Sequence, residues 1–287
     1  MNSMNNIITT PRTRPHKQVN ANNVYKIVIS KDFTGLCNQL WSVISGIIKC
    51  IKEGRHMLLI DKFLLNVHTK SYCSIDKILC LPSMNIFLQK YNLVLVDGAH
   101  INERNTPGLK VLNLGWEVIQ NPVNNHLKIE LFQNIRFAPS IVSPALKFVN
   151  DSQANQKKGT INVIHLRIEQ DWINHISSHS TPIVSQALVY KEITDKYIDM
   201  IRRHIQKDDS TFILTGSPNN KVIDYLRNNQ YTYFLFPKIT PYREMNAAMD
   251  MVIGKTCNNV FIGCGGSSFS DILLHRITGD NIQKYLC

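Results

Sequence analysis

The chain of 287 residues lacks several features that would assign it at once to a large class of proteins. It has no Asp-x-Asp pair, no Cys-x-x-Cys pair and no apolar run long enough to cross a bilayer. These absences argue against a metal-bridged diphosphate site, a zinc or thiol-redox site and a membrane span. No signal peptide is visible, and the seven cysteines are scattered and odd in number, so we expect a cytoplasmic protein.

Acidic residues are scarce relative to basic ones. The chain has 32 Lys and Arg residues against 21 Asp and Glu residues, a formal net charge of +11. A basic surface attracts anions, which include both nucleic acid and phosphorylated small molecules. The basic residues are scattered and do not alternate with aromatic residues as in a single-strand channel, so the pattern does not favour nucleic acid.

The pattern of apolar residues divides the chain into four parts. Residues 1–23 are rich in Asn, Thr and Pro without apolar periodicity, which predicts a disordered basic arm. Residues 24–150 predict an N-terminal Rossmann-like domain, although their order of strands and helices is less regular, and the polar residues 151–159 predict a linker. Strands and helices alternate cleanly in residues 160–287, which predicts βαβ units around a parallel sheet.

The expected elements follow from apolar runs and helical periodicity. Strands are expected over Tyr25–Ser30, Met57–Ile60, Leu93–Val96, Lys110–Leu114, Ile161–Leu166, Thr211–Thr215, Tyr231–Phe236 and Val260–Ile262. Helices are expected over Asn38–Ile51, Ile141–Val149, Val189–Ile205, Asn220–Asn228, Tyr242–Ile253 and Phe269–Arg276. The stretch around His175 and His179 contains Ser and Pro and has no third metal ligand nearby, so we expect a flexible acceptor loop there.

One polar turn stands out because of its charges. Residues 165–172 follow a buried apolar run and contain His165, Arg167, Glu169 and Asp171. Open α/β sheets bind their ligands at the carboxyl ends of the strands, so this turn predicts an anion site. A solvated loop with surface ion pairs is the alternative.

Two further turns have polar residues between a strand and a helix. Residues 33–40 include Gly35 and Asn38, where free N–H groups at a helix start can meet an anion or a sugar hydroxyl, or where Asn38 can cap the helix. Residues 261–270 are rich in Gly and Ser, which can bring backbone amides and hydroxyls close to a phosphate. This turn lacks the Lys of a P-loop and the GxGxxG spacing of a dinucleotide site.

Taken in order, the three turns resemble the motifs of the GDP-fucose-dependent fucosyltransferase superfamily, which includes the protein O-fucosyltransferases and the α1,2- and α1,6-fucosyltransferases. Residues 35–39 resemble the family's Gly-x-x-Asn-Gln turn, residues 165–171 its His-x-Arg-x-x-x-Asp motif, and residues 267–270 its Ser-Ser-Phe-Ser/Thr motif. The resemblance implies an α/β fold of the GT-B type, in which two Rossmann-like domains face each other across a cleft. The domain of residues 160–287 would hold the nucleotide sugar, and the domain of residues 24–150 would lie on the acceptor side.

The same resemblance implies roles for individual residues. Arg167 would contact the diphosphate and stabilise it as a leaving group, which suits a bidentate guanidinium. His165 and Asp250 would contact the nucleotide, with the carboxylate accepting from guanine N–H groups. The other implied contacts to the nucleotide sugar are Gly216, Ser217, Ser267, Ser268 and Phe269.

The implied reaction is the transfer of L-fucose from GDP-fucose to a hydroxyl of a glycan or protein acceptor, by inverting displacement without a metal ion or other cofactor. Glu169 and Asp171 are candidates for the base, with Glu169 slightly ahead because Asp171 can serve to orient Arg167. Asn38 would lie near the sugar and the acceptor.

Two alternatives stay open. One is a GT-B transferase that uses a different nucleotide sugar, because Gly216 follows Thr215 where relatives often carry an Asp beside the base. The other is a non-catalytic protein that binds anions or nucleic acid.

Overall fold

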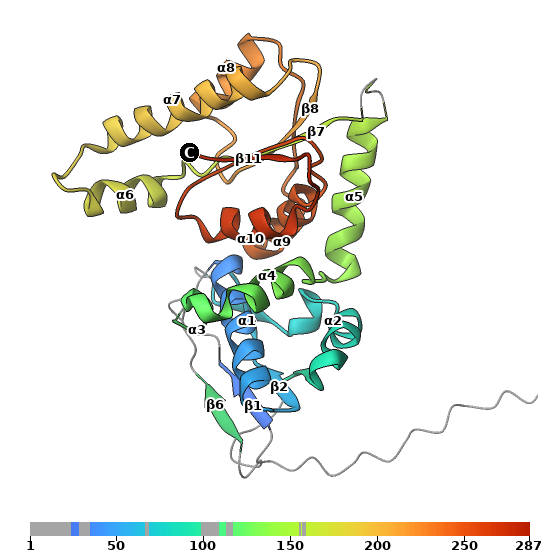
Figure 1. The fold of residues 1–287 in the computed structure, drawn as a ribbon. Helices are drawn as coiled ribbons and strands as arrows, with labels where there is room; N and C mark the ends of the chain where they lie inside the picture. Colours follow the sequence, from blue (N-terminus) through green and yellow to red (C-terminus); the bar gives the residue numbers. More distant parts are fainter. Residues whose placement is uncertain are drawn as a thin grey trace, which may run out of the picture.

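The computed structural model describes residues 24–28, 35–66, 69–98, 109–112, 117–154, 156 and 159–287. The basic arm predicted over residues 1–23 lies outside these ranges. The described residues form two parallel sheets, each covered by helices, and one small antiparallel pair of strands (Figure 1). Within them, no helix combines the length and the apolar character needed to span a membrane.

The N-terminal sheet has four parallel strands in the order β5-β2-β1-β6. Its strands are β1 (Val24–Ile27), β2 (Met57–Ile60), β5 (Val94–Asp97) and β6 (Lys110–Leu112), and the separate antiparallel pair is β3 (Phe63–Asn66) with β4 (Ser71–Cys73). Helices in this half are α1 (Leu36–Lys52), α2 (Leu81–Leu88), α3 (Glu117–Gln120) and α4 (Asn125–Gln133), and short 3-10 helices cover Ile75–Lys77, Gln89–Tyr91 and Pro122–Asn124. Helix α1 forms because its apolar residues recur at helical spacing, which buries Leu40, Ile44, Ile47 and Ile48 along it.

The C-terminal sheet has five parallel strands in the order β11-β10-β7-β8-β9. Its strands are β7 (Ile161–His165), β8 (Ser210–Leu214), β9 (Tyr233–Leu235), β10 (Val260–Gly263) and β11 (Gln283–Leu286). The helices are α6 (Gln170–His179), α7 (Gln186–His204), α8 (Lys221–Asn228), α9 (Arg243–Gly254) and α10 (Ser268–Arg276). The first strand of this half, β7, lies between β8 and β10. Strands β8 and β9 are added on one side of β7 and strands β10 and β11 on the other, so the order of the strands reverses between β7 and β10. Such a switch point is where open α/β sheets bind ligands.

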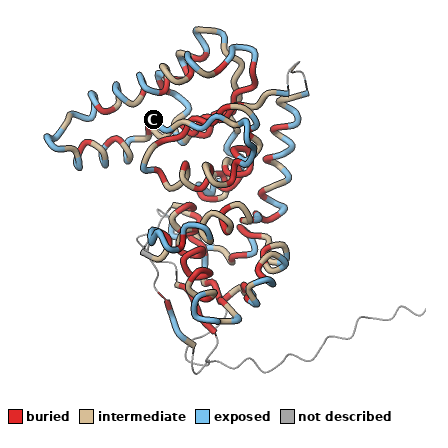
Figure 2. Tube along the Cα trace, in the orientation of Figure 1, coloured by how far each residue is buried: buried red, intermediate tan, exposed pale blue. Residues whose placement is uncertain are grey.

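The C-terminal sheet separates two layers of helices. Val163 and Ile164 are neighbours on β7 and point to opposite faces, as the pleat of a strand requires. Ile164 packs in a cluster with residues of α7 and α8, whereas Val163 belongs to a larger cluster with α9 and α10. The buried residues therefore lie on both faces of this sheet (Figure 2).

The two halves of the chain share one hydrophobic core. The cluster that contains Val163 continues through α9 and α10 into residues of α1, α2 and α4. Helices α9 and α10 lie between the C-terminal sheet and the N-terminal half (Figure 1). Helix α5 (Pro139–Gln153) packs along α9 and extends into the first residues of the predicted linker 151–159. The division into domains at residues 151–159 stays a prediction.

Candidate functional site

The three polar turns come together where the two halves of the chain meet. Ser268, at the start of α10, donates a hydrogen bond from Oγ to Oδ1 of Asn38 in the first turn of α1, over 3.0 Å. The ring of Phe269 stacks on His165 at the end of β7, with 4.4 Å between ring centroids. The structure thus joins residues of all three turns at the switch point of the C-terminal sheet.

His165 is held in one orientation. It is the last residue of β7 and is buried, and its Nδ1 lies 2.7 Å from Oγ of Ser270. The same Oγ accepts a hydrogen bond from the backbone N–H of Cys264 over 2.8 Å. Burial, together with the charge of Arg167, lowers the pKa of His165 to about 3, so its imidazole is neutral at physiological pH.

Arg167 is clamped between two carboxylates. Its Nη1 donates to Oε2 of Glu169 over 2.9 Å, and its Nη2 donates to Oδ2 of Asp171 over 2.8 Å. Burial lowers its pKa, but the charges of Glu169 and Asp171 outweigh that effect and raise it. The indole ring of Trp172 lies 5.7 Å from the guanidinium carbon. The guanidinium therefore keeps its charge and is fixed at the carboxyl end of β7.

A buried tyrosine supports this turn from behind. The hydroxyl of Tyr197 on α7 donates to the carbonyl of His165 over 2.7 Å and accepts from the backbone N–H of Arg167 over 3.4 Å. Tyr197 is fully buried. This role was not predictable from the sequence, because Tyr197 belongs to an ordinary helical stripe of apolar residues.

The two candidate bases have different surroundings. Both oxygens of Glu169 have partners, since Oε1 accepts from the N–H of Gly216 over 2.8 Å while Oε2 pairs with Arg167. The side chain of Glu169 is 18% exposed, against 59% for Asp171. Burial raises the pKa of Asp171, but the hydrogen bond from Arg167 and its charge lower it overall. Asp171 is therefore the carboxylate more open to an incoming hydroxyl.

The turn after β8 is ordered by its own hydroxyl. Oγ1 of Thr215 donates to the carbonyl of Leu166 over 3.0 Å and accepts from the N–H of Ser217 over 3.1 Å. A Cβ on Gly216 would lie 2.8 Å from Oε1 of Glu169, so any larger residue there would displace the Glu169 carboxylate. The absence of a side chain at Gly216 is what lets Glu169 reach this turn.

Asp250 lies on the inner helix α9. Burial raises the pKa of Asp250 to about 8, and the nearby charge of Lys238 lowers it to a lesser extent. Lys238 also extends to the carbonyl of Gly216, at 3.4 Å. Lys238 thus lies near both Asp250 and the turn after β8. Lys238 was not identified from the sequence as a residue of the site.

Glu244 links the two halves through the start of α1. Its Oε2 accepts a hydrogen bond from the backbone N–H of Leu36 over 2.5 Å, and its side chain is 4% exposed. Burial raises the pKa of Glu244 to about 7, against opposing effects of Arg243 and of the Leu36 hydrogen bond. The cap role considered for Asn38 is wrong, because the N-cap of α1 is Gly35, which makes no side-chain cap. A carboxylate 208 positions away in the sequence takes that role.

The stretch around His175 is a helix, contrary to the flexible acceptor loop predicted for it. Helix α6 begins directly after Glu169 and ends at His179. The rings of His175 and His179 are one turn apart, with centroids separated by 4.3 Å, and His175 also stacks on Trp172. Few residues of α6 are buried, among them Ile173, so the helical periodicity of its apolar residues is weak in the sequence. Among the described residues, no group of three His, Cys, Asp or Glu side chains is placed to hold a metal ion.

Comparison with known proteins bears on the fold. No protein-family model and no curated protein sequence matches the chain. The crystal structure of POFUT1 in complex with GDP-fucose is similar to it with a TM-score of 0.60 at 10% identity, over 93% of this chain and 98% of the other. A second crystal form of that complex gives 0.61 at 12% identity, over 92% and 97%. NodZ α-1,6-fucosyltransferase soaked with GDP-fucose gives 0.51 at 15% identity, over 88% and 92%.

The chain has a GDP-fucose fucosyltransferase-like fold. This fold is of the GT-B type, which confirms the fold class expected from the sequence. The strand orders of the two sheets agree with this fold, because the first strand of each sheet lies in its interior and later strands lie on both sides of that strand. At such low identity the similarity extends to the fold alone, so the roles of individual residues rest on the geometry above.

Proposed function

We propose that the protein is a glycosyltransferase that transfers L-fucose from GDP-fucose to a hydroxyl of a glycan or protein acceptor, by inverting displacement without a metal ion. The observation that carries this proposal is the fixed guanidinium of Arg167 at the switch point of the C-terminal sheet, two residues after His165, which stacks on Phe269 of α10. A cation held there by two carboxylates needs no reorganisation when charge grows on a leaving diphosphate.

The start of α10 supplies the other groups for the diphosphate. Ser267 is its N-cap residue and makes no side-chain cap, so its hydroxyl can serve a ligand. The first N–H groups of a helix have no partner within the helix and attract anions. Arg167, Ser267 and Ser268 would together bind the diphosphate, and Asn38, which contacts Ser268, would lie beside the sugar.

The nucleotide would extend from His165 and Phe269 towards Asp250. A stacked pair of rings gives a flat wall, and the partly protonated Asp250 can both accept and donate hydrogen bonds. The N–H groups of guanine are the donors that a carboxylate at this place would accept from. Gly216 and Ser217 would line the same end of the site from the turn after β8.

Removal of the acceptor proton falls to Asp171 in this proposal. Glu169 uses both oxygens to hold Arg167 and Gly216, so we assign it a positioning role. Asp171 is open to solvent, and its lowered pKa keeps it ionised. The geometry thus favours Asp171 over Glu169 as the base, whereas the sequence slightly favours Glu169.

A hydrolysis panel with the full chain tests the proposal. GDP-fucose, GDP-mannose and UDP-galactose would be incubated with the protein, and release of the nucleoside diphosphate followed by chromatography. We expect release from GDP-fucose above the other two. A preference for the UDP sugar would favour the second candidate, a GT-B transferase with another donor. Two observations support that candidate: no Asp follows Thr215, and Lys238 contacts Gly216.

A further inference from the structure

A separate pocket lies beside Trp172. It has a volume of about 210 Å³ and is enclosed by helices α6 and α7 and by residues at the carboxyl ends of β10 and β11. Trp172 forms one wall, and the same indole ring lies 5.7 Å from the guanidinium carbon of Arg167. None of the residues assigned above to the nucleotide sugar lines this pocket.

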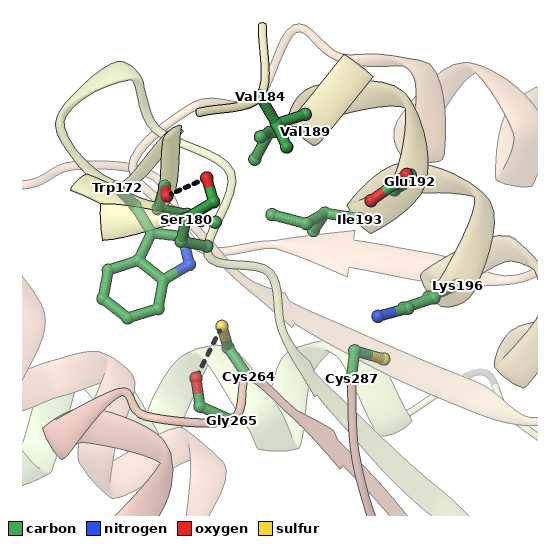
Figure 3. Close-up of a pocket in the computed structure, with 11 residues that line it drawn as sticks. Trp172, Ser180, Val184, Val189, Glu192, Ile193, Lys196, Cys264, Gly265 and Cys287 are labelled. Carbon is green, nitrogen blue, oxygen red and sulfur yellow. Dashed lines mark hydrogen bonds between the residues drawn. The ribbon is translucent and has the colours of Figure 1, made fainter. Parts of the chain in front are cut away.

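One side of the pocket is hydrocarbon. Ile176, Val184, Val189 and Ile193 line it, and Figure 3 shows the last three around the upper part of the space. An apolar cavity of about 150 Å³ is enough to bind a benzene ring. A pocket of about 210 Å³ can therefore hold one ring and a small polar group.

The other side has two N–H donors that face each other. The indole Nε1 of Trp172 is buried, and its only hydrogen-bonding neighbour among the described residues is the thiol of Cys264, a weak acceptor that leaves most of its donor strength unused. Figure 3 shows Lys196 extending from α7 into the space opposite that nitrogen. Burial raises the pKa of the Cys287 thiol to about 12 despite the opposing charge of Lys196, so no thiolate neutralises the ammonium.

Among the described residues that line the pocket, Glu192 is the one with an acidic side chain. It precedes Lys196 by one turn of α7 and forms no ion pair with it in the described structure. The negative charge of Glu192 repels an anion. Removal of this charge is therefore expected to strengthen the binding of an anion in the pocket.

We propose that this pocket binds a small carboxylate with a cyclic hydrocarbon body. The ring packs against Ile176, Val184 and Ile193, and the carboxylate accepts from the indole N–H of Trp172 and from Lys196. An occupant there lies against the same indole that flanks Arg167. The proposal does not depend on the donor, and it is tested without one.

Nuclear magnetic resonance on the full chain tests the proposal with three probes of similar shape: benzoate, benzyl alcohol and benzylammonium. The readout is the indole N–H signal of Trp172, assigned by its loss in Trp172→Phe. We expect a saturable shift with benzoate, binding of benzyl alcohol about fivefold weaker, and no binding of benzylammonium. Equal affinities for the three probes, or no saturable shift with benzoate, would overturn the proposal.

Matched variants on α7 separate the contributions. Lys196→Gln should reduce benzoate affinity to that of benzyl alcohol, and Glu192→Gln should increase it. Lys191→Gln, on the same helix but paired with Asp195 outside the pocket, should change nothing. An unchanged benzoate affinity in Lys196→Gln contradicts the assignment.

Filling the pocket gives a test that does not involve charge. Ile193→Trp should abolish binding of both benzoate and benzyl alcohol, with folding checked by thermal unfolding. Because Ile193 packs against the core, Val184→Phe serves as a second blocking variant at a position before α7. Benzoate binding that persists in a folded blocking variant shows that the ligand lies elsewhere.

Discussion

The two halves of the chain use the same strand arrangement for different purposes. Each sheet has its first strand in the interior, and the next described element along the chain after each first strand is a helix. The turn after β7 and the residues next to it carry His165, Arg167, Glu169 and Asp171, whereas the described residues at the start of α1 offer Asn38 and backbone amides. One of those amides, at Leu36, is already bonded to Glu244 from the other half.

This difference assigns the charged chemistry to one half. A helix start attracts anions, but the start of α1 faces the carboxylate of Glu244. The start of α10 makes no side-chain cap, and its Phe269 stacks on His165, two residues before Arg167. Under the proposed function, the same local fold therefore serves as an anion site in the C-terminal half, whereas in the N-terminal half it makes an internal contact. Only the tertiary arrangement decides between them.

The largest expected effect separates the two turns directly. Arg167→Ala should reduce GDP-fucose hydrolysis about 1,000-fold, because it removes a fixed cation from the leaving group. Asn38→Ala should reduce it about tenfold at most, since Asn38 makes one neutral contact, to Ser268. Steady-state rates with Arg203→Ala as a surface control on α7 would check this. Equal losses in Arg167→Ala and Asn38→Ala would remove the proposed division of labour.

The next prediction distinguishes the two carboxylates of the C-terminal turn, Glu169 and Asp171. Asp171→Asn should reduce transfer to an acceptor about 100-fold, because it removes the base. Glu169→Gln should cost about tenfold, because Gln keeps the Gly216 contact and loses only the charge that holds Arg167. The pH dependence of kcat/KM is the measurement, with its acidic limb lost in Asp171→Asn. A lost limb in Glu169→Gln instead would restore Glu169 as the base.

A third effect concerns acid stability, because His165 is a buried titratable group on the first strand of the C-terminal sheet. Its folded pKa is about 3 against an ordinary 6.5, so the unfolded chain takes up the proton first and stability falls as pH drops below 6.5. Between pH 6.5 and 4.5 this loss is about 2 kcal/mol. His165→Phe should show a shallower loss in denaturant titrations at the two pH values. An unchanged pH dependence in His165→Phe would show that His165 does not set the acid limit.

The smallest effect tests the contact that joins the halves. Glu244→Ala leaves the N–H of Leu36 buried without an acceptor, whereas Glu244→Gln keeps one. At pH 8 the Ala variant should therefore be about 1 kcal/mol less stable than the Gln variant. Equal unfolding free energies of the two variants would mean that this hydrogen bond does not stabilise the junction.

The strands of the fold were largely predictable, and the reasons differ between the halves. The buried run Met57–Ile60 and the clean alternation after residue 160 correspond to observed strands and helices within a few residues. The pair β3 and β4, helices α2 and α4, and strand β11 were not expected, because short elements give weak periodicity. Helix α6 was predicted as a loop because polar residues dominate its exposed face.

For the site, the sequence indicated which turns matter, but it could not give their contacts. Asn38 and Ser268 lie 230 positions apart, and their hydrogen bond depends on how the two halves pack. The same holds for Glu244 with Leu36 and for Tyr197 behind Arg167. Long-range contacts between polar groups have no local periodicity, so a single sequence does not contain a signal for them.

Calorimetric titration of the full chain with GDP and with UDP measures whether the proposed site at Arg167 and Asp250 selects guanine. We expect GDP to bind at least tenfold more tightly than UDP, and Arg167→Ala to weaken the binding of GDP by a similar factor. Binding of UDP as tight as that of GDP, or GDP binding unchanged in Arg167→Ala, would contradict the proposed function.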